Sequence, residues 1–131
     1  MNIALYASLL AALPIIDSAW LFSMGAFYRK HLDFVFDEKF HLGPAALFYV
    51  IYAFALMHFV VAPALRSGTP LIAVFVSGAI LGLAAYGAYD LTNQATLKNW
   101  PMIVTVVDMA WGAFVSGVAS MIVVGLFNYF K

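Results

Sequence analysis

The stretch that decides the fold runs from Ala85 to Gly112 and reads AYGAYDLTNQATLKNWPMIVTVVDMAWG. Two acidic residues, Asp90 and Asp108, flank a short polar turn in a chain that is 66% hydrophobic and only 9% charged. Burial of an isolated charge in hydrocarbon is costly, so an acidic residue within an apolar run needs a structural or functional reason. We therefore interpret this polar turn and its flanking residues as the functional region of the molecule.

The composition indicates an integral membrane protein with a single domain. A soluble domain carries about a quarter of its residues as charges, whereas this chain of 131 residues has a mean hydropathy of +0.99. The net charge is zero and there is no basic patch, which argues against a nucleic-acid partner. The absence of cysteine excludes a disulfide framework and a thiolate metal site.

Four apolar runs are each long enough to span a hydrocarbon core about 30 Å thick, which takes roughly 20 helical residues. They cover residues 3–27, 43–61, 70–92 and 102–127. We therefore expect an all-α bundle of four transmembrane helices that forms one transmembrane domain over residues 1–131. The segment from Pro63 to Pro70 is a natural break, and Pro14 predicts a kink about one turn before Asp17, although tolerated prolines are common in such helices.

Alternating helix directions place residues 28–42 and 93–100 on the same side of the membrane, which we call the polar side. Most of the basic residues lie there, namely Arg29, Lys30, Lys39 and Lys98. The other side carries Arg66 and Lys131. Because basic loops tend to stay in the cytoplasm, this small excess predicts that the polar side is cytoplasmic.

Small residues recur every four positions in the third and fourth runs, as Gly78 and Gly82, and as Gly112, Ser116 and Ser120. Such spacing lets two helix backbones approach closely in a membrane, where apolar burial between helices gives no driving force. We expect the third and fourth helices to pack against each other along these positions. The alternative is that one of the two rows faces a second subunit in a homodimer.

The motif Asp-x-Ala-Trp occurs twice, at residues 17–20 and 108–111, on helices that run in opposite directions. Three-residue spacing puts both side chains on one helical face. Each aspartate is therefore expected to have the tryptophan of its own motif beside it, with an indole N–H that can donate a hydrogen bond. The alternative is a chance repeat in a chain built from few residue types.

The ionisable residues in the apolar runs lie at stepped depths, estimated from a rise of about 1.5 Å per residue. Asp90 lies near the polar-side boundary and within reach of water, Asp108 roughly 10 Å further in, and Asp17 near the middle of the bilayer. His58 is deeper still, toward the opposite side. This arrangement indicates an ion or proton route or the polar lining of a cavity. The alternative is that each aspartate only holds helices together through hydrogen bonds.

Several aromatic residues fall near these acids, and they either line a pocket or form an interfacial belt. They are Trp20, Tyr28, Tyr86, Tyr89, Trp100 and Trp111. We favour the belt for Tyr28 and Trp100. Tyr49 and Tyr52 occupy neighbouring faces of the second helix, so at most one of them is expected to point to the centre of the bundle.

The candidate ligand or proton site gathers Asp17, Trp20, Asp90, Asn93, Asp108 and Trp111, with His58 and Tyr86 as further candidates. For His58 alone, a hydrogen-bonded helix residue is the favoured interpretation. No metal site is expected, because HExxH and Glu-x-x-His motifs are absent. The loop histidines His31 and His41 are interpreted as part of a solvated, mixed-charge loop. No cofactor is expected, and no catalytic motif supports an enzyme.

The strings YDLTNQATLKNWP (residues 89–101) and VTVVDMAWG (residues 104–112) make the chain resemble a family of small four-span bacterial membrane proteins of unknown function. The likeness extends to residues 17–20, to ALFYVIY (residues 46–52) and to PALRSG (residues 63–68). The resemblance implies a multi-pass protein of the bacterial cytoplasmic membrane with four helices. It implies no catalytic residue.

Three hypotheses for the function remain at this point. The first is a bundle that binds or passes a small solute or a proton at the internal Asp/Trp site. The second is a structural or lipid-binding accessory protein, with membrane lipids as partners, in which the acids only hold the helices together. The third is an intramembrane lipid-modifying enzyme that uses an aspartate as acid or base.

Overall fold

The computed structural model describes residues 2–131, and every regular element in that range is a helix. The elements are α1 (Asn2–Leu32), α2 (Leu42–Leu56), the π-helical turn η1 (Met57–Val61), α3 (Ala62–Ser67), α4 (Leu71–Thr96) and α5 (Met102–Tyr129). Because α2, η1 and α3 follow one another without a gap, they form one long helix over Leu42–Ser67. All four resulting helices are long and apolar enough to cross a membrane, which confirms the predicted all-α membrane bundle.

The helices extend further toward the polar side than the sequence predicted. The last turn of α1 holds Arg29, Lys30 and His31, where positive charge interacts favourably with the helix dipole. At the same side of the bundle α4 continues to Thr96, so Asn93 is helical and does not lie in the turn. The polar connections are therefore shorter than expected, and they cover residues 33–41 and 97–101.

The predicted break at residues 63–70 is wrong in its first half. The helix continues through Pro63, and the widened turn η1 precedes this proline, which has no N–H to offer to a regular helical hydrogen bond. The chain turns only after Ser67, where Gly68 adopts the left-handed conformation at φ 64° and caps the helix. Helix α1 likewise runs without interruption through Pro14.

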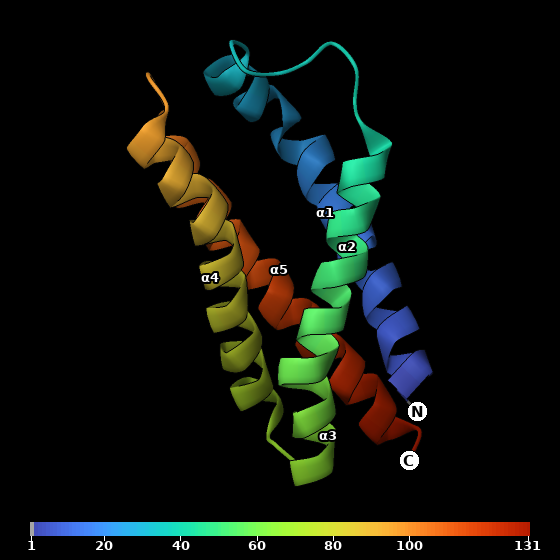
Figure 1. Cartoon of the computed structure of the whole chain (residues 1–131). Helices are drawn as coiled ribbons and strands as arrows, with labels where there is room; N and C mark the ends of the chain where they lie inside the picture. The colour runs from blue at the N-terminus through green and yellow to red at the C-terminus, as the bar shows by residue number, and fades with distance from the viewer. Residues whose placement is uncertain (1) are drawn as a thin grey trace.

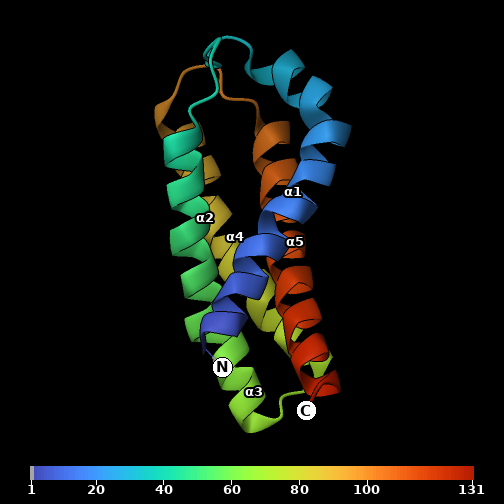
Figure 2. The same ribbon diagram turned by 90° about the vertical axis from the view of Figure 1, so that its right-hand side faces the viewer.

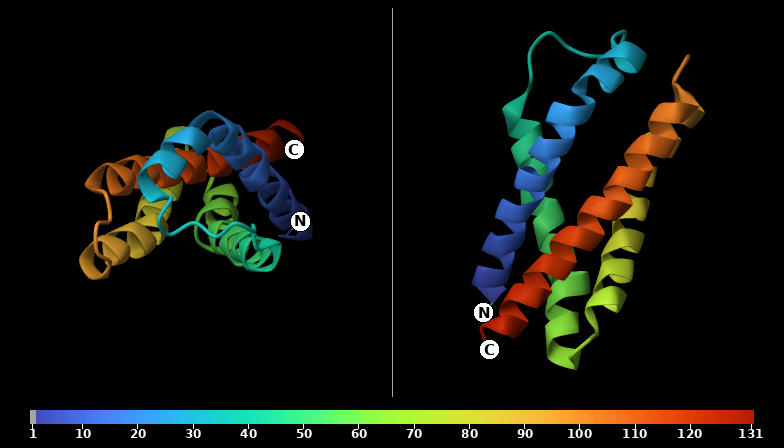
Figure 3. Two further views of the ribbon diagram at one scale, coloured as in Figure 1. Left: turned by 90° about the horizontal axis from the view of Figure 1, so that it is seen from above. Right: turned by 180° about the vertical axis from the view of Figure 1, so that it is seen from behind.

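The two chain termini lie at one end of the bundle, and the two polar connections lie at the other end (Figures 1 and 2). Helix α5 packs against α1 on one side and against α4 on the other, as the rear view in Figure 3 shows. Helix α2 packs against α1. Toward the polar end α2 stands away from the other helices (Figures 1 and 3), whereas the end of α1 stays in contact with the start of α5 through Leu32, Trp100 and Val104.

Helices α4 and α5 pack along the rows of small residues. A Cβ atom added to Gly82 would overlap the backbone oxygen of Gly112 and would approach the Ser116 Cβ to 2.7 Å. A Cβ atom added to Gly78 would lie 2.7 Å from the Ser116 backbone oxygen. Real Cβ atoms are not found this close to other atoms, so these two helices touch at their backbones. The prediction that both rows face each other within one chain is confirmed.

The half of the bundle near the termini is a closed apolar core. Its largest fully buried side chains are Leu5, Leu9, Leu13, Leu56, Val61, Val74, Val115, Val123 and Val124. Within this region Tyr52 bonds to Ser116 at 2.5 Å, which links α2 to α5 at the upper edge of the core. The core thus holds the four helices together below the level at which the polar groups begin.

Candidate functional site

A cavity of about 1000 Å³ lies between the helices at the polar end, and we call it the acidic cavity. It reaches from Asp17 in the middle of α1 to the loop 33–41, and it receives side chains from α1, α2, α4 and α5. All six acidic residues of the chain line it, namely Asp17, Asp33, Asp37, Glu38, Asp90 and Asp108. Of the six Lys and Arg residues, only Arg29 and Lys39 do so. The negative charge of the chain is therefore concentrated around this cavity.

Helical periodicity explains how the cavity wall is assembled. On α1 the lining residues Asp17, Leu21, Gly25, Tyr28 and Leu32 follow steps of three or four, so they form one stripe along the helix. On α5 the same spacing aligns Val104, Asp108 and Trp111. On α4 the wall is made by Tyr86, Tyr89 and Asp90.

The two Asp-x-Ala-Trp motifs pair across the helices and not within them. In the antiparallel pair of α1 and α5, Trp20 stacks on Trp111 with ring centroids 4.3 Å apart and planes 6° from parallel. The Trp111 indole then donates to Asp17, the acid of the other motif, at 2.7 Å. The expectation that each aspartate binds the tryptophan of its own motif is wrong, because the Trp111 indole donates to Asp17 and the Trp20 indole donates to Tyr28.

Asp17 is held by the protein on both of its carboxyl oxygens. It accepts hydrogen bonds from the Tyr49 hydroxyl at 2.6 Å and from the Trp111 indole at 2.7 Å, and its side chain is 9% exposed. Because an indole N–H can only donate, the Asp17 oxygen that faces Trp111 acts as an acceptor. Asp17 thereby joins α1, α2 and α5 at the floor of the acidic cavity.

Asp108 accepts a hydrogen bond from one residue near the polar end of α1. Tyr28 donates its hydroxyl to Asp108 at 2.8 Å, and the Trp20 indole donates to the same hydroxyl at 3.1 Å. The interpretation of Tyr28 as an interfacial belt residue is wrong, since it lines the acidic cavity. Trp100, the other expected belt residue, is buried and donates to Thr105 at 3.0 Å.

Asp90 has no hydrogen-bond partner among the described residues for either carboxyl oxygen. Its side chain is 0% exposed although it lies in the wall of the acidic cavity, so the expectation of a water-accessible Asp90 near the boundary is wrong. The reason is that α4 continues to Thr96 and carries Asp90 deeper into the bundle. Asp90 is thus a fully buried carboxyl group without a protein partner, a rare situation in folded proteins.

The structure brings together most of the predicted site residues and separates two of them. Asp17, Trp20, Asp90, Asp108, Trp111 and Tyr86 all line the acidic cavity. Asn93 and His58 do not line it, and His58 is exposed in η1, where its ring stacks on Phe54. Both Tyr49 and Tyr52 point inward to hydrogen-bond partners, so the expectation that at most one does is wrong.

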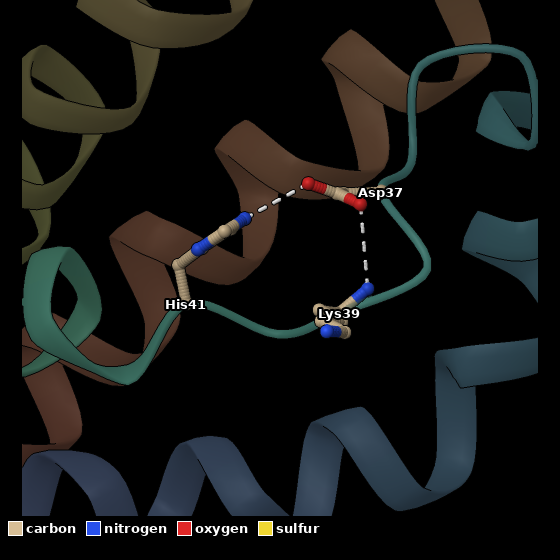
Figure 4. A network of polar contacts seen from close by, with 3 residues as sticks. All are labelled: Asp37, Lys39 and His41. Carbon is tan, nitrogen blue, oxygen red and sulfur yellow. Dashed lines mark hydrogen bonds and ion pairs between the residues drawn. The ribbon is translucent and has the colours of Figure 1, made fainter.

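The loop 33–41, whose side chains are exposed, lines the polar end of the acidic cavity, which we call its mouth. In this loop His41 pairs with Asp37 at 2.8 Å, and the backbone N–H of Lys39 bonds to the same carboxyl group at 3.4 Å (Figure 4). The hydrogen bond from His41, followed by that from Lys39, lowers the pKa of the Asp37 carboxyl below its ordinary value. Within residues 2–131 no three His, Cys, Asp or Glu side chains come together in a way that could hold a metal ion.

The chain was compared with protein families, curated proteins and solved structures. No curated protein and no solved structure matches it. One family model, described as "Predicted membrane protein (DUF2177)", matches residues 2–125. That match covers all four membrane helices but for the last turn of α5, together with every residue of the acidic cavity. The chain therefore belongs to the DUF2177 family of membrane proteins, whose function is unknown.

Proposed function

We propose that the protein binds a small solute in the acidic cavity and receives it from the polar side. The observation that carries this proposal is the gathering of all six acidic residues around one space that opens at the loop 33–41. A charged group in a membrane helix is expensive and tends to mark a ligand or ion site. The volume, about 1000 Å³, is at the upper end of that of pockets that bind small molecules.

Closure at the other end favours binding over free passage. Below Asp17 the bundle is filled by the fully buried side chains of the apolar core, such as Leu13, Leu56 and Val115. A continuous proton or ion route needs polar groups or water along its whole length, and here the buried carboxyl groups are confined to one half of the bundle. Release of a solute on the far side would therefore require rearrangement of the core.

A structural role is the second candidate, and it is favoured by Asp17 in particular. Both oxygens of this carboxyl group are occupied by donors from two other helices. Hydrogen bonds of this kind hold helices together in membranes. The two candidate functions therefore use different acids. In the structural role Asp17 holds the helices together, and in solute binding Asp90 contacts the solute.

We also propose that the protein lies in the bacterial cytoplasmic membrane, with the loop 33–41 on the cytoplasmic side. Membrane lipids surround the bundle in this proposal, and a homodimer is the alternative to a single chain. The orientation is supported by four of the six Lys and Arg residues, which lie near the polar end. Because the chain contains no cysteine, single cysteines placed in the loop 33–41 and at Ser67 would report the orientation by labelling in intact cells. Crosslinking in native membranes would show whether a dimer forms.

The proposed function is tested by native mass spectrometry of the protein extracted from its own membrane, with wild type measured beside Asp108→Asn. We expect the wild type to retain a small molecule and the variant to lose it. Wild-type and variant proteins that both carry nothing, with the variant only less stable, would favour the structural role. The retained mass would also give the chemical class of the solute.

A further inference from the structure

The charge of the acidic cavity is distributed by depth. Its inner part is lined by Asp17, Asp90 and Asp108, and no Lys, Arg or His side chain lines it at that depth. The basic side chains that line it are Lys39 and His41 in its mouth and Arg29 in the last turn of α1. A solute that moves inward therefore leaves the basic residues behind and meets only carboxyl groups and neutral side chains. Such a gradient attracts cations and repels anions.

The Asp90 carboxyl group lacks the hydrogen-bond donors that a buried carboxylate needs. Both of its oxygens are acceptors, and neither has a donor among residues 2–131. Asp108, which also lines the cavity, is another carboxyl group and brings no positive charge. A solute that brings N–H donors and a positive charge would satisfy both deficits at once.

The remaining wall of the acidic cavity is aromatic. The side chains concerned are Trp20, Tyr28, Tyr49, Tyr86, Tyr89 and Trp111. Rings of this kind bury apolar groups and also attract cations placed over their faces. The wall therefore suits a molecule with a positively charged nitrogen and an apolar or aromatic body.

We infer that the solute is a protonated amine with an apolar or aromatic body, whose ammonium group lies at Asp90 and Asp108. This inference rests on the proposed function, because it names the chemical class that the acidic cavity would take. An ammonium group supplies three N–H donors, which the two oxygens of Asp90 lack, and one positive charge beside both carboxyl groups. A bare metal ion fits less well, since within the described chain no three acidic or histidine side chains converge on one point.

The test compares three probes that share a phenyl ring and differ in charge. They are 2-phenylethylammonium, the neutral 2-phenylethanol and the anion 3-phenylpropanoate. Binding to the whole purified protein in detergent is measured by calorimetry and by quenching of tryptophan fluorescence. A hydrogen bond to a charged group corresponds to about a 10- to 100-fold change in affinity, so we expect the amine to bind at least about 10-fold more tightly than the alcohol.

The matched variants are Asp90→Asn and Asp33→Asn, which make the same chemical change at two depths. Asp90→Asn keeps the shape of the side chain, and we expect it to weaken binding of the amine about 10- to 100-fold while 2-phenylethanol binding changes little. Asp33 lies in the exposed mouth, where water screens its charge, so Asp33→Asn should weaken the amine by less than about threefold. Thermal unfolding of each variant shows whether it is folded.

The other outcomes separate this inference from the proposed function. If the alcohol or the anion binds as tightly as the amine, or if Asp90→Asn leaves amine binding unchanged in a folded protein, the inference is overturned and a solute site still stands. Binding of Ca²⁺ alone that depends on Asp90, without amine binding, overturns it as well. If none of the three probes binds, the inference fails. The proposed function fails with it only if the protein from its own membrane also carries no solute.

Discussion

The substitutions Asp17→Asn and Asp90→Asn make the same chemical change in the same cavity, and the structure predicts opposite effects on stability. Asp17 accepts two short hydrogen bonds from neighbouring helices, whereas Asp90 accepts none. Asp17→Asn should therefore destabilise the bundle. Asp90→Asn should leave its stability unchanged or raise it, because it removes a buried acidic group that the protein does not compensate.

The magnitude follows from the two bonds of Asp17. In Asp17→Asn the amide oxygen still accepts from Trp111, and the Tyr49 hydroxyl can rotate to accept from the new amide N–H. Both contacts persist in weakened form, since the bond with Tyr49 must reverse its direction. Hydrogen bonds between membrane helices are worth about 0.6 kcal/mol on average and up to about 1.7 kcal/mol. Weakening two short ones should therefore cost about 1–2 kcal/mol of unfolding free energy.

The assay is reversible unfolding in mixed micelles, where increasing SDS unfolds the helices and circular dichroism or tryptophan fluorescence reports the transition. The two variants and the wild type are measured at the same pH and detergent concentration. Equal destabilisation by both substitutions would refute the reasoning, because it would mean that Asp90 has a stabilising partner. A stable Asp17→Asn variant would remove the structural role of Asp17.

Two further predictions concern the helix seam and the loop. Gly82→Ala should destabilise the bundle by about 1–3 kcal/mol, since the added Cβ would overlap the Gly112 backbone. The control Gly25→Ala, whose Cβ would meet nothing within 4 Å, should be neutral or stabilise the helix by up to about 1 kcal/mol. Equal effects of both substitutions in the same unfolding assay would contradict this packing. In the loop, the pKa of the Asp37 carboxyl lies below its ordinary value. The Asp37 contacts therefore contribute their full stability at a pH above the ordinary pKa, and this stability is lost as the pH falls through the lowered pKa. A carbon-detected NMR titration should find a low midpoint for Asp37 and a return toward the ordinary value in His41→Ala, and an unchanged midpoint would show that His41 is not the cause.

Much of the fold could be predicted because it depends on patterns along single helices. Hydrophobic runs long enough to cross a membrane identify four helices, and the four-residue spacing of Gly78 and Gly82 identifies the face that α5 covers. The helix ends were less predictable. Polar residues such as Asn93 stay helical at a membrane boundary, where composition alone suggests a turn.

The partners within the candidate site could not be predicted, because they depend on how the helices are rotated and staggered. The acids Asp17 and Asp108 stand out in the sequence, but their donors Tyr49 and Tyr28 lie on other helices and carry no local signal. One clue was available for the crossed pairing. A four-residue motif repeated on two antiparallel helices can place an aspartate level with the tryptophan of the other motif, as Asp17 and Trp111 show, whereas Asp108 accepts from Tyr28.

The central claim, an open acidic cavity that admits cations from the polar side, is tested most directly by thiol labelling of Gly25→Cys. Gly25 lines the cavity wall, and the chain has no other cysteine. Membrane-impermeant methanethiosulfonate reagents of opposite charge are applied to membranes from each side, with the core variant Ala119→Cys as the control. We expect the cationic reagent to label Gly25→Cys faster than the anionic one, from the side of the loop 33–41, while Ala119→Cys stays unlabelled. No labelling of folded Gly25→Cys, or equal rates with both reagents, would contradict it.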